Sequence, residues 1–229
     1  MGFKYETHMH SSQVSGCAIK TAAVQVQHYK NLGYTGLIFT DHFTNGFTNC
    51  PGYLSWNDKM RFTASGYEKA KNEGDKYGID IFFGWEFTIR GSDFLTYGLD
   101  LDFLFAHPDI DRLPINEYSA VIRNNGGFLA QAHPYKDDYY VQYKFPVDHR
   151  FVDAIEVYNS SVPEYVNGKA LKFAIKYDIP MLAGTDSHGR HNQFHSGIEL
   201  SKKAENIFDI IEAIKCRDVK LILPVERNI

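Results

Sequence analysis

The chain has few cysteines, no excess of positive charge and no long apolar run, and each shortage excludes a class of protein. Cys17, Cys50 and Cys216 are far apart and form no CxxC motif. A disulfide framework is therefore not expected, and a reducing compartment fits better. No stretch approaches the roughly 18 apolar residues that a membrane span needs, and the first residues lack the apolar core of a signal peptide. We therefore expect a cytoplasmic protein that does not bind a membrane.

The charge balance is mildly acidic, with 24 basic and 28 acidic residues and a formal net charge of −4. Such a balance does not favour the broad basic surface of a nucleic-acid-binding protein. Hydrophobic residues at 44% and charged residues at 23% are typical of a globular protein. The 229 residues are enough for one large domain with a sizeable core, and we treat 1–229 as one domain. What the chain has in excess is histidine, with ten residues, roughly twice the ordinary usage.

Short apolar segments alternate with longer amphipathic segments along the chain. We expect extended segments at 4–8, 36–40, 79–87, 94–97, 101–105, 128–132, 153–158, 180–184 and 219–223. We expect helices at 19–32, 58–77, 114–125, 163–177 and 204–215, from helical spacing of apolar residues or from proline and glycine at their ends. Strands that alternate with helices imply a parallel sheet, and about seven such units suit a small α/β barrel.

Histidines and acidic residues gather where five of these strands end. They are His8 and His10, Asp41 and His42, Glu86, His133, and Asp186 and His188. The carboxyl ends of parallel strands form the edge at which sites are built, so we expect these side chains to meet. Both imidazoles of His8-Met9-His10 point to one side of a strand. Since imidazole and carboxylate are ligands for Zn, Mn and Fe, the pattern predicts a metal centre.

Together these stretches resemble the ordered motifs of the PHP (polymerase and histidinol phosphatase) superfamily. They read His8-Met9-His10, Thr40-Asp41-His42, Glu86, Ala132-His133-Pro134 and Gly184-Thr185-Asp186-Ser187-His188. The resemblance covers nearly the whole chain, from residue 5 to about residue 190. It implies a distorted (β/α)7 barrel whose mouth, at the carboxyl ends of the strands, holds two or three metal ions. It also implies hydrolysis of phosphoesters by a metal-bound hydroxide.

The resemblance further implies a role for each matching residue. His8, His10 and Asp186 would hold one ion, Glu86 would bridge it to a second ion held also by His133 and Asp93, and His42 and His188 would hold a third. Of these residues, Glu86, Asp186 and His188 are the ones on which we expect catalysis to depend.

Two positions depart from the family pattern. Asp93 precedes Phe94-Leu95-Thr96-Tyr97-Gly98, where many members have histidine, and a carboxylate there shifts the preference toward harder ions such as Mn. His107 is the rival to Asp93 as a ligand. For the third ion, the candidates soon after His-x-His are Gln13 and Ser15, both weak ligands.

Cations near these motifs are candidates for binding the phosphate of a substrate. Lys136, shortly after His133, is the first candidate, followed by Arg190 and then Arg90. Two acidic residues have open roles. Asp41 either orients a ligand histidine, which we favour, or caps the following turn. Glu156 either lines the mouth of the barrel or is a buried polar group satisfied by the backbone.

The leading hypothesis is a metal-dependent phosphomonoesterase whose partner is a small phosphorylated metabolite. One alternative is a phosphodiesterase or nuclease acting on nucleotides or oligonucleotides, because related domains accompany DNA polymerases. The lack of a visible basic and aromatic groove argues against it. A tyrosine phosphatase also lies within the resemblance. The non-enzymatic alternative is a barrel that binds metal for structure or sensing.

Overall fold

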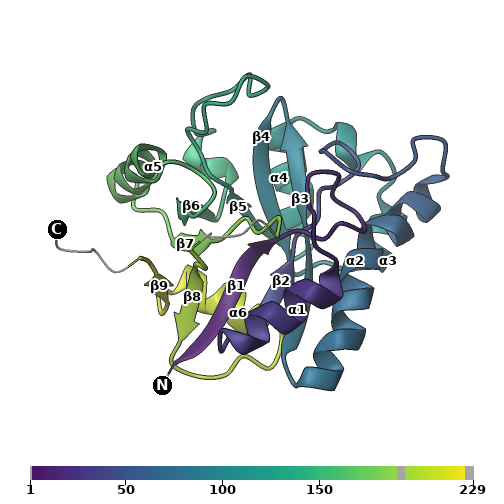
Figure 1. Cartoon of the computed structure of the whole chain (residues 1–229). Coiled ribbons are helices and arrows are strands. Elements are labelled where there is room, and N and C mark those ends of the chain that lie inside the picture. Colours follow the sequence, from purple (N-terminus) through teal and green to yellow (C-terminus); the bar gives the residue numbers. More distant parts are fainter. Residues whose placement is uncertain (1, 190–193, 225–229) are drawn as a thin grey trace.

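The computed structural model describes residues 2–189 and 194–224, and a strongly curved sheet runs through its centre (Figure 1). The strands are β1 (Phe3–Met9), β2 (Gly36–Phe39), β3 (Asp80–Ile89), β4 (Ser92–Tyr97), β5 (Phe128–Gln131), β6 (Ala154–Asn159), β7 (Met181–Gly184), β8 (Gly197–Leu200) and β9 (Lys220–Ile222). The helices are α1 (Ala22–Asn31), α2 (Trp56–Tyr77), α3 (Leu101–Ala106), α4 (Ile115–Asn124), α5 (Glu164–Lys176) and α6 (Ile207–Lys215), with 3-10 helices at Ile110–Arg112 and His149–Phe151.

The strands lie in the order β7-β6-β5-β4-β3-β2-β1-β8-β9. The sets β1–β3 and β5–β7 are each parallel, whereas β4 runs antiparallel to both of its neighbours. On the far side of β1, β8 and β9 are added in antiparallel fashion. Strand β7 also contacts β1 and β8, so the sheet is nearly closed. The predicted distorted α/β barrel is confirmed, as a mixed barrel.

Three local features differ from the sequence-based expectation. Strand β4 is antiparallel because Arg90 and Gly91, with φ of 50° and 80°, form a two-residue turn of the kind that joins hairpin strands. The sequence pattern does not predict strand β8. The expected extended segment 101–105 is wrong, because it forms helix α3. The side chain of Asp100 accepts from the Phe103 N–H, a helix cap that starts α3 in an apolar run whose periodicity is ambiguous.

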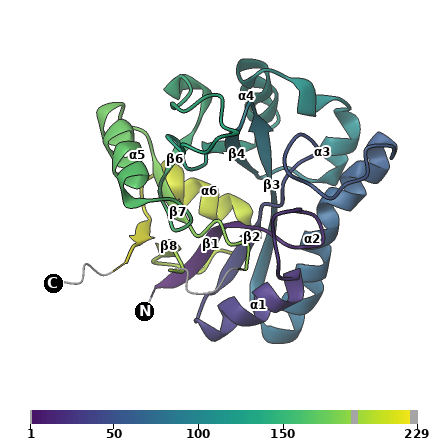
Figure 2. The ribbon, with the colours of Figure 1, turned by 45° about the horizontal axis from the view of Figure 1, so that its top comes forward.

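The inner core fills the end of the barrel where the parallel strands begin. Ile210, Ile211 and Ile214 of α6 pack there with inward-facing strand residues such as Tyr97 and Phe128. In Figure 2, α6 lies at the centre of the view and α1, α2, α4 and α5 lie around it. Because apolar side chains and α6 occupy this end, polar inward-facing side chains gather at the other end.

The outer helices cover the sheet with separate apolar clusters. On the side of α1 and α2, Val26 and Tyr29 pack in one cluster with Leu37 of β2. Around β3, Trp85 is fully buried and donates a hydrogen bond to the hydroxyl of Tyr118 on α4. Among the described residues, no helix is both long and apolar enough to cross a membrane.

Strand β1 contains an irregularity that decides where its histidines point. Its pairing with β2 runs from Glu6 opposite Leu37 to Met9 opposite Phe39, so β1 has one residue more than β2 in this interval. This is the pattern of a β-bulge. Tyr5 packs in the inner core, yet Met9 packs in the outer cluster, although residues four apart share a face in a regular strand. The bulge therefore turns His8 to the inside of the barrel.

Candidate metal centre

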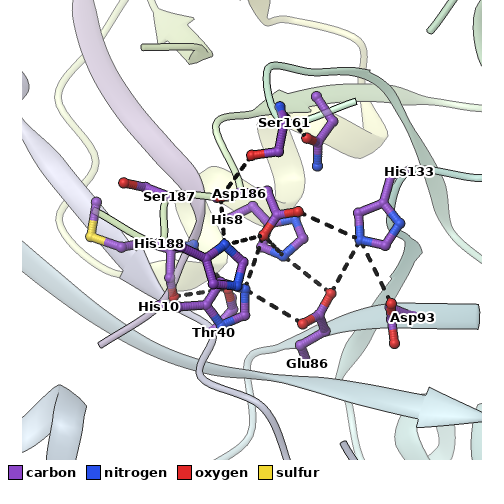
Figure 3. A network of polar contacts seen from close by, with 12 residues as sticks. His8, His10, Thr40, Glu86, Asp93, His133, Ser161, Asp186, Ser187 and His188 are labelled. Carbon is purple, nitrogen blue, oxygen red and sulfur yellow. Dashed lines mark hydrogen bonds and ion pairs between the residues drawn. The ribbon is translucent and has the colours of Figure 1, made fainter. Parts of the chain in front are cut away.

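Eight ionisable side chains converge at the end of the barrel where the parallel strands finish, and Figure 3 shows most of them. They are His8, His10, His42, Glu86, Asp93, His133, Asp186 and His188, here called the metal-ligand cluster. They form four overlapping groups of three, and within each group the candidate ligand atoms lie within 4.8 Å of one another. These are the eight residues that the resemblance implies as ligands. Their role as ligands stays a prediction, whereas their convergence is an observation.

Glu86 of β3 lies at the centre of the cluster. Its Oε1 is 3.2 Å from Nε2 of His8 and 3.4 Å from Nε2 of His133. Its Oε2 is 2.7 Å from Nδ1 of His42 and 3.5 Å from Nε2 of His10. The two oxygens thus contact histidines that the resemblance assigns to the first, second and third ions, which is the position of a carboxylate shared between ions.

Asp186 contacts the same histidines from the opposite side. Its Oδ1 is 3.2 Å from Nε2 of His10 and 3.5 Å from Nε2 of His8. The φ angles of Asp186 and His133 are 53° and 27°, in the left-handed region that costs a residue other than glycine about 1–3 kcal/mol. Hydrogen bonds hold both conformations, because Ser161 Oγ donates to the carbonyl of Asp186 and the His133 N–H donates to Glu156 at 2.8 Å.

Hydrogen bonds to Nδ1 orient two of the histidines. Nδ1 of His8 donates to Oε1 of Glu156 at 3.1 Å, and Nδ1 of His188 donates to the carbonyl of Asp186 at 2.9 Å. A proton held on Nδ1 leaves the lone pair on Nε2 available to a metal. Glu156, for which the sequence left two roles open, therefore touches the cluster directly and orients His8.

A serine connects Asp41 to the cluster. Nδ1 of His10 lies 3.1 Å from Ser15 Oγ, which itself donates to Oδ1 of Asp41 at 2.7 Å and accepts from the His42 N–H. Because the hydroxyl proton of Ser15 goes to Asp41, His10 is the donor in its contact with Ser15. Burial raises the pKa of Asp41 to about 6, against hydrogen bonds from Ser11 and Ser15 that lower it. Asp41 thus acts on His10 through Ser15, which fits the orienting role favoured from the sequence.

The donor set fits divalent ions. Nε2 of His8, Nε2 of His10 and Oε2 of Glu86 are buried without a hydrogen-bond partner among the described residues. Burial, followed by the charges of His188 and His42, lowers the pKa of His10 well below its usual value, which keeps the imidazole neutral as a ligand must be. Burial opposes a proton on His8, yet the neighbouring carboxylates, Asp186 foremost, raise its pKa. Without metal, protons on the histidines balance the negative charge of these carboxylates. Bound cations would displace those protons.

Lys136 is the predicted phosphate-binding residue that the structure brings toward the cluster. Its side chain is 22% exposed, and its ammonium lies 3.7 Å from Asp138 Oδ2 and 5.5 Å from the centre of the Tyr140 ring. Burial lowers the pKa of Lys136, but Asp186, Tyr140 and Asp93 raise it to a net value above normal. Lys136 is therefore a charged group that lines one small hollow with Asp93 and His133, and the charge of Asp186 acts on it.

Of the other two predicted cations, the structure describes one. Arg90 is exposed in the β3–β4 turn, where its Nη1 donates to the Tyr143 hydroxyl at 2.6 Å. Arg190 lies outside the described residues.

Two predicted ligand candidates have other partners. Gln13 Oε1 accepts from the Ala22 N–H at the start of α1. Nδ1 of His107 donates to the carbonyl of Phe103 at 2.7 Å, and its ring stacks on that of Phe103. Asp93, by contrast, lies in the cluster with His133 Nε2 at 3.8 Å from its Oδ2, so the structure places Asp93 rather than its rival there.

Two residues beside the cluster are not among the expected ligands: Glu6, and Cys17, which the sequence favours as a small buried residue over one that approaches the site. Glu6 is fully buried, and its Oε1 accepts N–H groups from His8 and Thr185, which fixes β1 to the segment after β7. Burial raises the pKa of Glu6 to about 7, against hydrogen bonds led by Thr185. Sγ of Cys17 lies 3.2 Å from Nε2 of His42. A thiol seven residues after His10, in the same loop as Gln13 and Ser15, was the signal that could have identified it.

Comparison with known proteins gives matches among solved structures only. No family model matches the chain, and neither does any curated protein. A two-domain protein from Bacteroides vulgatus containing a predicted PHP-like metal-dependent phosphoesterase is 18% identical with a TM-score of 0.70, and the match covers 97% of this chain and 65% of that one. A candidate metal-dependent phosphoesterase from Bifidobacterium adolescentis is 14% identical with a TM-score of 0.57, covering 95% and 97%. An amidohydrolase from Chromobacterium violaceum, with bound sulfate and no metal, is 13% identical with a TM-score of 0.54, covering 97% and 99%.

These identities are low, so the likeness concerns the fold. The chain spans 65% of the length of the two-domain Bacteroides vulgatus protein. The resemblance to the PHP superfamily that the motifs indicate is confirmed at this level. The chain therefore has the distorted α/β barrel fold of PHP-like metal-dependent phosphoesterases, with a buried cluster of histidine, aspartate and glutamate able to bind metal ions at its mouth.

Proposed function

We propose that the protein hydrolyses a phosphomonoester of a small metabolite, with two or three divalent ions (Zn, Mn or Fe) held by the metal-ligand cluster. The observation that carries this proposal is the position of Glu86, whose two carboxylate oxygens face different pairs of histidines. A carboxylate shared by two adjacent ions is the central element of a two-metal hydrolytic site.

Each ion would have its own set of side chains. His8, His10 and Asp186 would hold the first, Glu86, Asp93 and His133 the second, and His42 and His188 a third, with Glu86 shared. The chemistry that such ions supply when bound is Lewis-acid catalysis, which polarises the phosphoryl group and acidifies a water molecule. The carboxylates of Glu86, Asp93 and Asp186 together carry three negative charges. The carboxylate of Glu156, which accepts from His8, adds a fourth, so two divalent ions would balance these charges, and Lys136 or a third ion would supply the positive charge that favours an anionic substrate.

The exposure of the side chains supports one direction of approach for a substrate. His8 and His10 are fully buried, whereas the side chains of His42 and His188 are 12% and 16% exposed. Lys136, at 22%, lies on the exposed side as well. The phosphate would therefore approach past His42, His188 and Lys136. The Lys136 ammonium would bind its oxygens, and the organic group would extend toward solvent.

The experiment is hydrolysis of p-nitrophenyl phosphate and of bis-p-nitrophenyl phosphate after reconstitution with Mn, Zn or Fe. We expect turnover of the monoester, and we expect Glu86→Gln to reduce it to background, because the amide cannot bridge two cations as a carboxylate does. Glu117→Gln is the matched control, since Glu117 is an exposed glutamate on α4.

Three outcomes would contradict the proposal. Turnover of the diester alone would favour the phosphodiesterase alternative. Bound metal without turnover of either ester would favour the non-catalytic metal-binding barrel. Normal monoester turnover by Glu86→Gln would show that the chemistry takes place elsewhere.

A further inference from the structure

Cys17 is held against two histidines of the metal-ligand cluster by the loop between β1 and α1. Its Sγ lies 3.2 Å from Nε2 of His42 and also interacts with the His188 side chain. Backbone hydrogen bonds fix the chain on both sides of this residue: the Gly16 N–H donates to Phe47 at 2.8 Å, and the Ile19 N–H donates to His188 at 2.9 Å. The thiol therefore has a defined position beside the cluster.

The nitrogen atoms around this thiol are directed as ligand atoms. Nδ1 of His42 faces Glu86 at 2.7 Å, so its Nε2 is the atom that faces Cys17. Nδ1 of His188 donates to the carbonyl of Asp186, which leaves Nε2 with the lone pair.

A second observation comes from His10, which the proposed function assigns to the first ion and which borders the third position. This residue is fully buried, and its Nε2 has no hydrogen-bond partner within the part of the chain that the structure describes. Its ring lies 4.5 Å from that of His42 and 4.3 Å from that of His188, measured between centroids. One candidate ligand atom from each of the three histidines lies within 4.8 Å of the others, a spacing that a cation can span.

We propose that Cys17 is a thiolate ligand that completes, with His42 and His188, the third metal position, and that this position selects zinc over manganese. The proposal rests on the proposed function only in requiring that the cluster binds metal. The two candidates that the sequence offered are occupied elsewhere, since Gln13 caps α1 and Ser15 is engaged with His10, His42 and Asp41.

Distances and ligand chemistry both support a thiolate. Tetrahedral zinc with bonds of roughly 2.3 Å to sulfur and 2.05 Å to nitrogen separates the two ligand atoms by about 3.6 Å. The observed separation of 3.2 Å between Cys17 and His42 is close to that value, so a small side-chain movement suffices. Thiolate is a soft ligand that favours zinc, whereas manganese prefers oxygen. The carboxylate-rich second position with Asp93 would have the opposite preference.

The test is spectroscopic. Metal-free protein is reconstituted with Co²⁺, because a cobalt–thiolate bond gives an intense charge-transfer absorption in the near ultraviolet that imidazole and carboxylate do not give. We expect this band in the wild-type protein and its loss in Cys17→Ser, together with the loss of one metal ion per chain by mass spectrometry. Cys50→Ser and Cys216→Ser are controls, since both are free cysteines outside the cluster, and they should keep the band.

A second variant separates ligand chemistry from folding. Cys17→Asp should keep the number of ions, lose the band and shift the zinc-to-manganese preference toward manganese at least tenfold. Absence of the band in the wild-type protein, or its persistence in Cys17→Ser, would overturn the proposal. Loss of the band in a Cys17→Ser variant that binds as many ions as the wild type and keeps its metal preference would also overturn it.

The two proposals can fail separately. A protein that shows the cobalt–thiolate band but hydrolyses neither phosphate ester contradicts the proposed function and supports Cys17 as a ligand. A protein that hydrolyses the monoester but shows no band contradicts Cys17 as a ligand and supports the proposed function.

Discussion

Replacing Glu156 by glutamine tests whether the orientation of His8 depends on one carboxylate. Glu156 accepts hydrogen bonds with both of its oxygens: Oε1 accepts from His8, and Oε2 accepts from the His133 N–H at 2.8 Å and from Nδ2 of Asn159 at 2.9 Å. Glutamine keeps the size of the side chain but replaces one oxygen with an NH₂ donor.

Neither placement of the amide satisfies these contacts. An NH₂ group in the place of Oε2 faces two donors, from His133 and Asn159. An NH₂ group in the place of Oε1 faces Nδ1 of His8, so the His8 proton must move to Nε2, the nitrogen directed at Glu86. A buried unpaired polar group costs about 1–3 kcal/mol, and losing the partner that orients a ligand histidine typically weakens metal binding by about 10–100-fold. The two estimates agree, since a factor of 10–100 is about 1.4–2.7 kcal/mol.

The assay is competition for Zn²⁺ between the metal-free protein and a chromophoric chelator. We expect Glu156→Gln to bind zinc about 10–100-fold more weakly than the wild type. Glu117→Gln, which changes an exposed glutamate, should not alter the affinity. Equal affinities of Glu156→Gln and wild type would refute the reasoning that Glu156 sets the tautomer of His8.

Further predictions concern substrate binding, pH and the core. Lys136→Met should lower kcat/KM for a phosphomonoester by roughly 10–100-fold, mainly through KM in steady-state kinetics, with metal content unchanged; an unaltered KM would remove Lys136 from the phosphate site. Because Asp186 and neighbouring carboxylates raise the pKa of His8 against burial, its proton persists above pH 6.5 in the metal-free protein. Zinc affinity, measured by chelator competition, should then rise with pH by about tenfold per unit for each proton displaced. The metal-free protein should lose stability as the pH rises through that pKa. A zinc affinity that does not depend on pH would contradict this. Phe128→Ala removes a fully buried ring stacked on Tyr97 and should lower the free energy of unfolding by about 3–5 kcal/mol in denaturant titration, without weakening zinc binding, because Phe128 packs at the opposite end of the barrel.

The elements with a strong apolar period could be predicted from the sequence. The direction of a strand and the short elements could not. Helices α2, α4 and α5 lie within two residues of the ranges that the pattern indicates. The antiparallel direction of β4 depends on a two-residue turn at Arg90 and Gly91. The apolar alternation of the two strands does not encode whether the chain reverses between them. Residues 101–105 were ambiguous because five residues, four of them apolar, are too few to show a period, and the cap at Asp100 decides for a helix.

The candidate site was predictable where it depends on strand ends, and less so in its loops. His8, Glu86 and Asp186 follow or close apolar strands, so parallel topology brings the backbone at these positions to one end of the barrel, while the bulge in β1 turns His8 inward. Ser15 and Cys17 lie in a loop without regular structure, whose path is set by tertiary hydrogen bonds such as that of Gly16 with Phe47. Which of the loop residues faces the histidines therefore required the three-dimensional structure.

The bulge in β1 also acts against misalignment. If β1 paired regularly with β2 beyond Glu6, His8 and His10 would face the outer apolar layer and Met9 would enter the mouth of the barrel. Two imidazoles would then be desolvated among apolar side chains, away from Glu86. Burial of the same two residues that would bind metal thus raises the free energy of the shifted register. In this strand, the placement of two proposed metal ligands and the selection of a single alignment during folding depend on one extra residue.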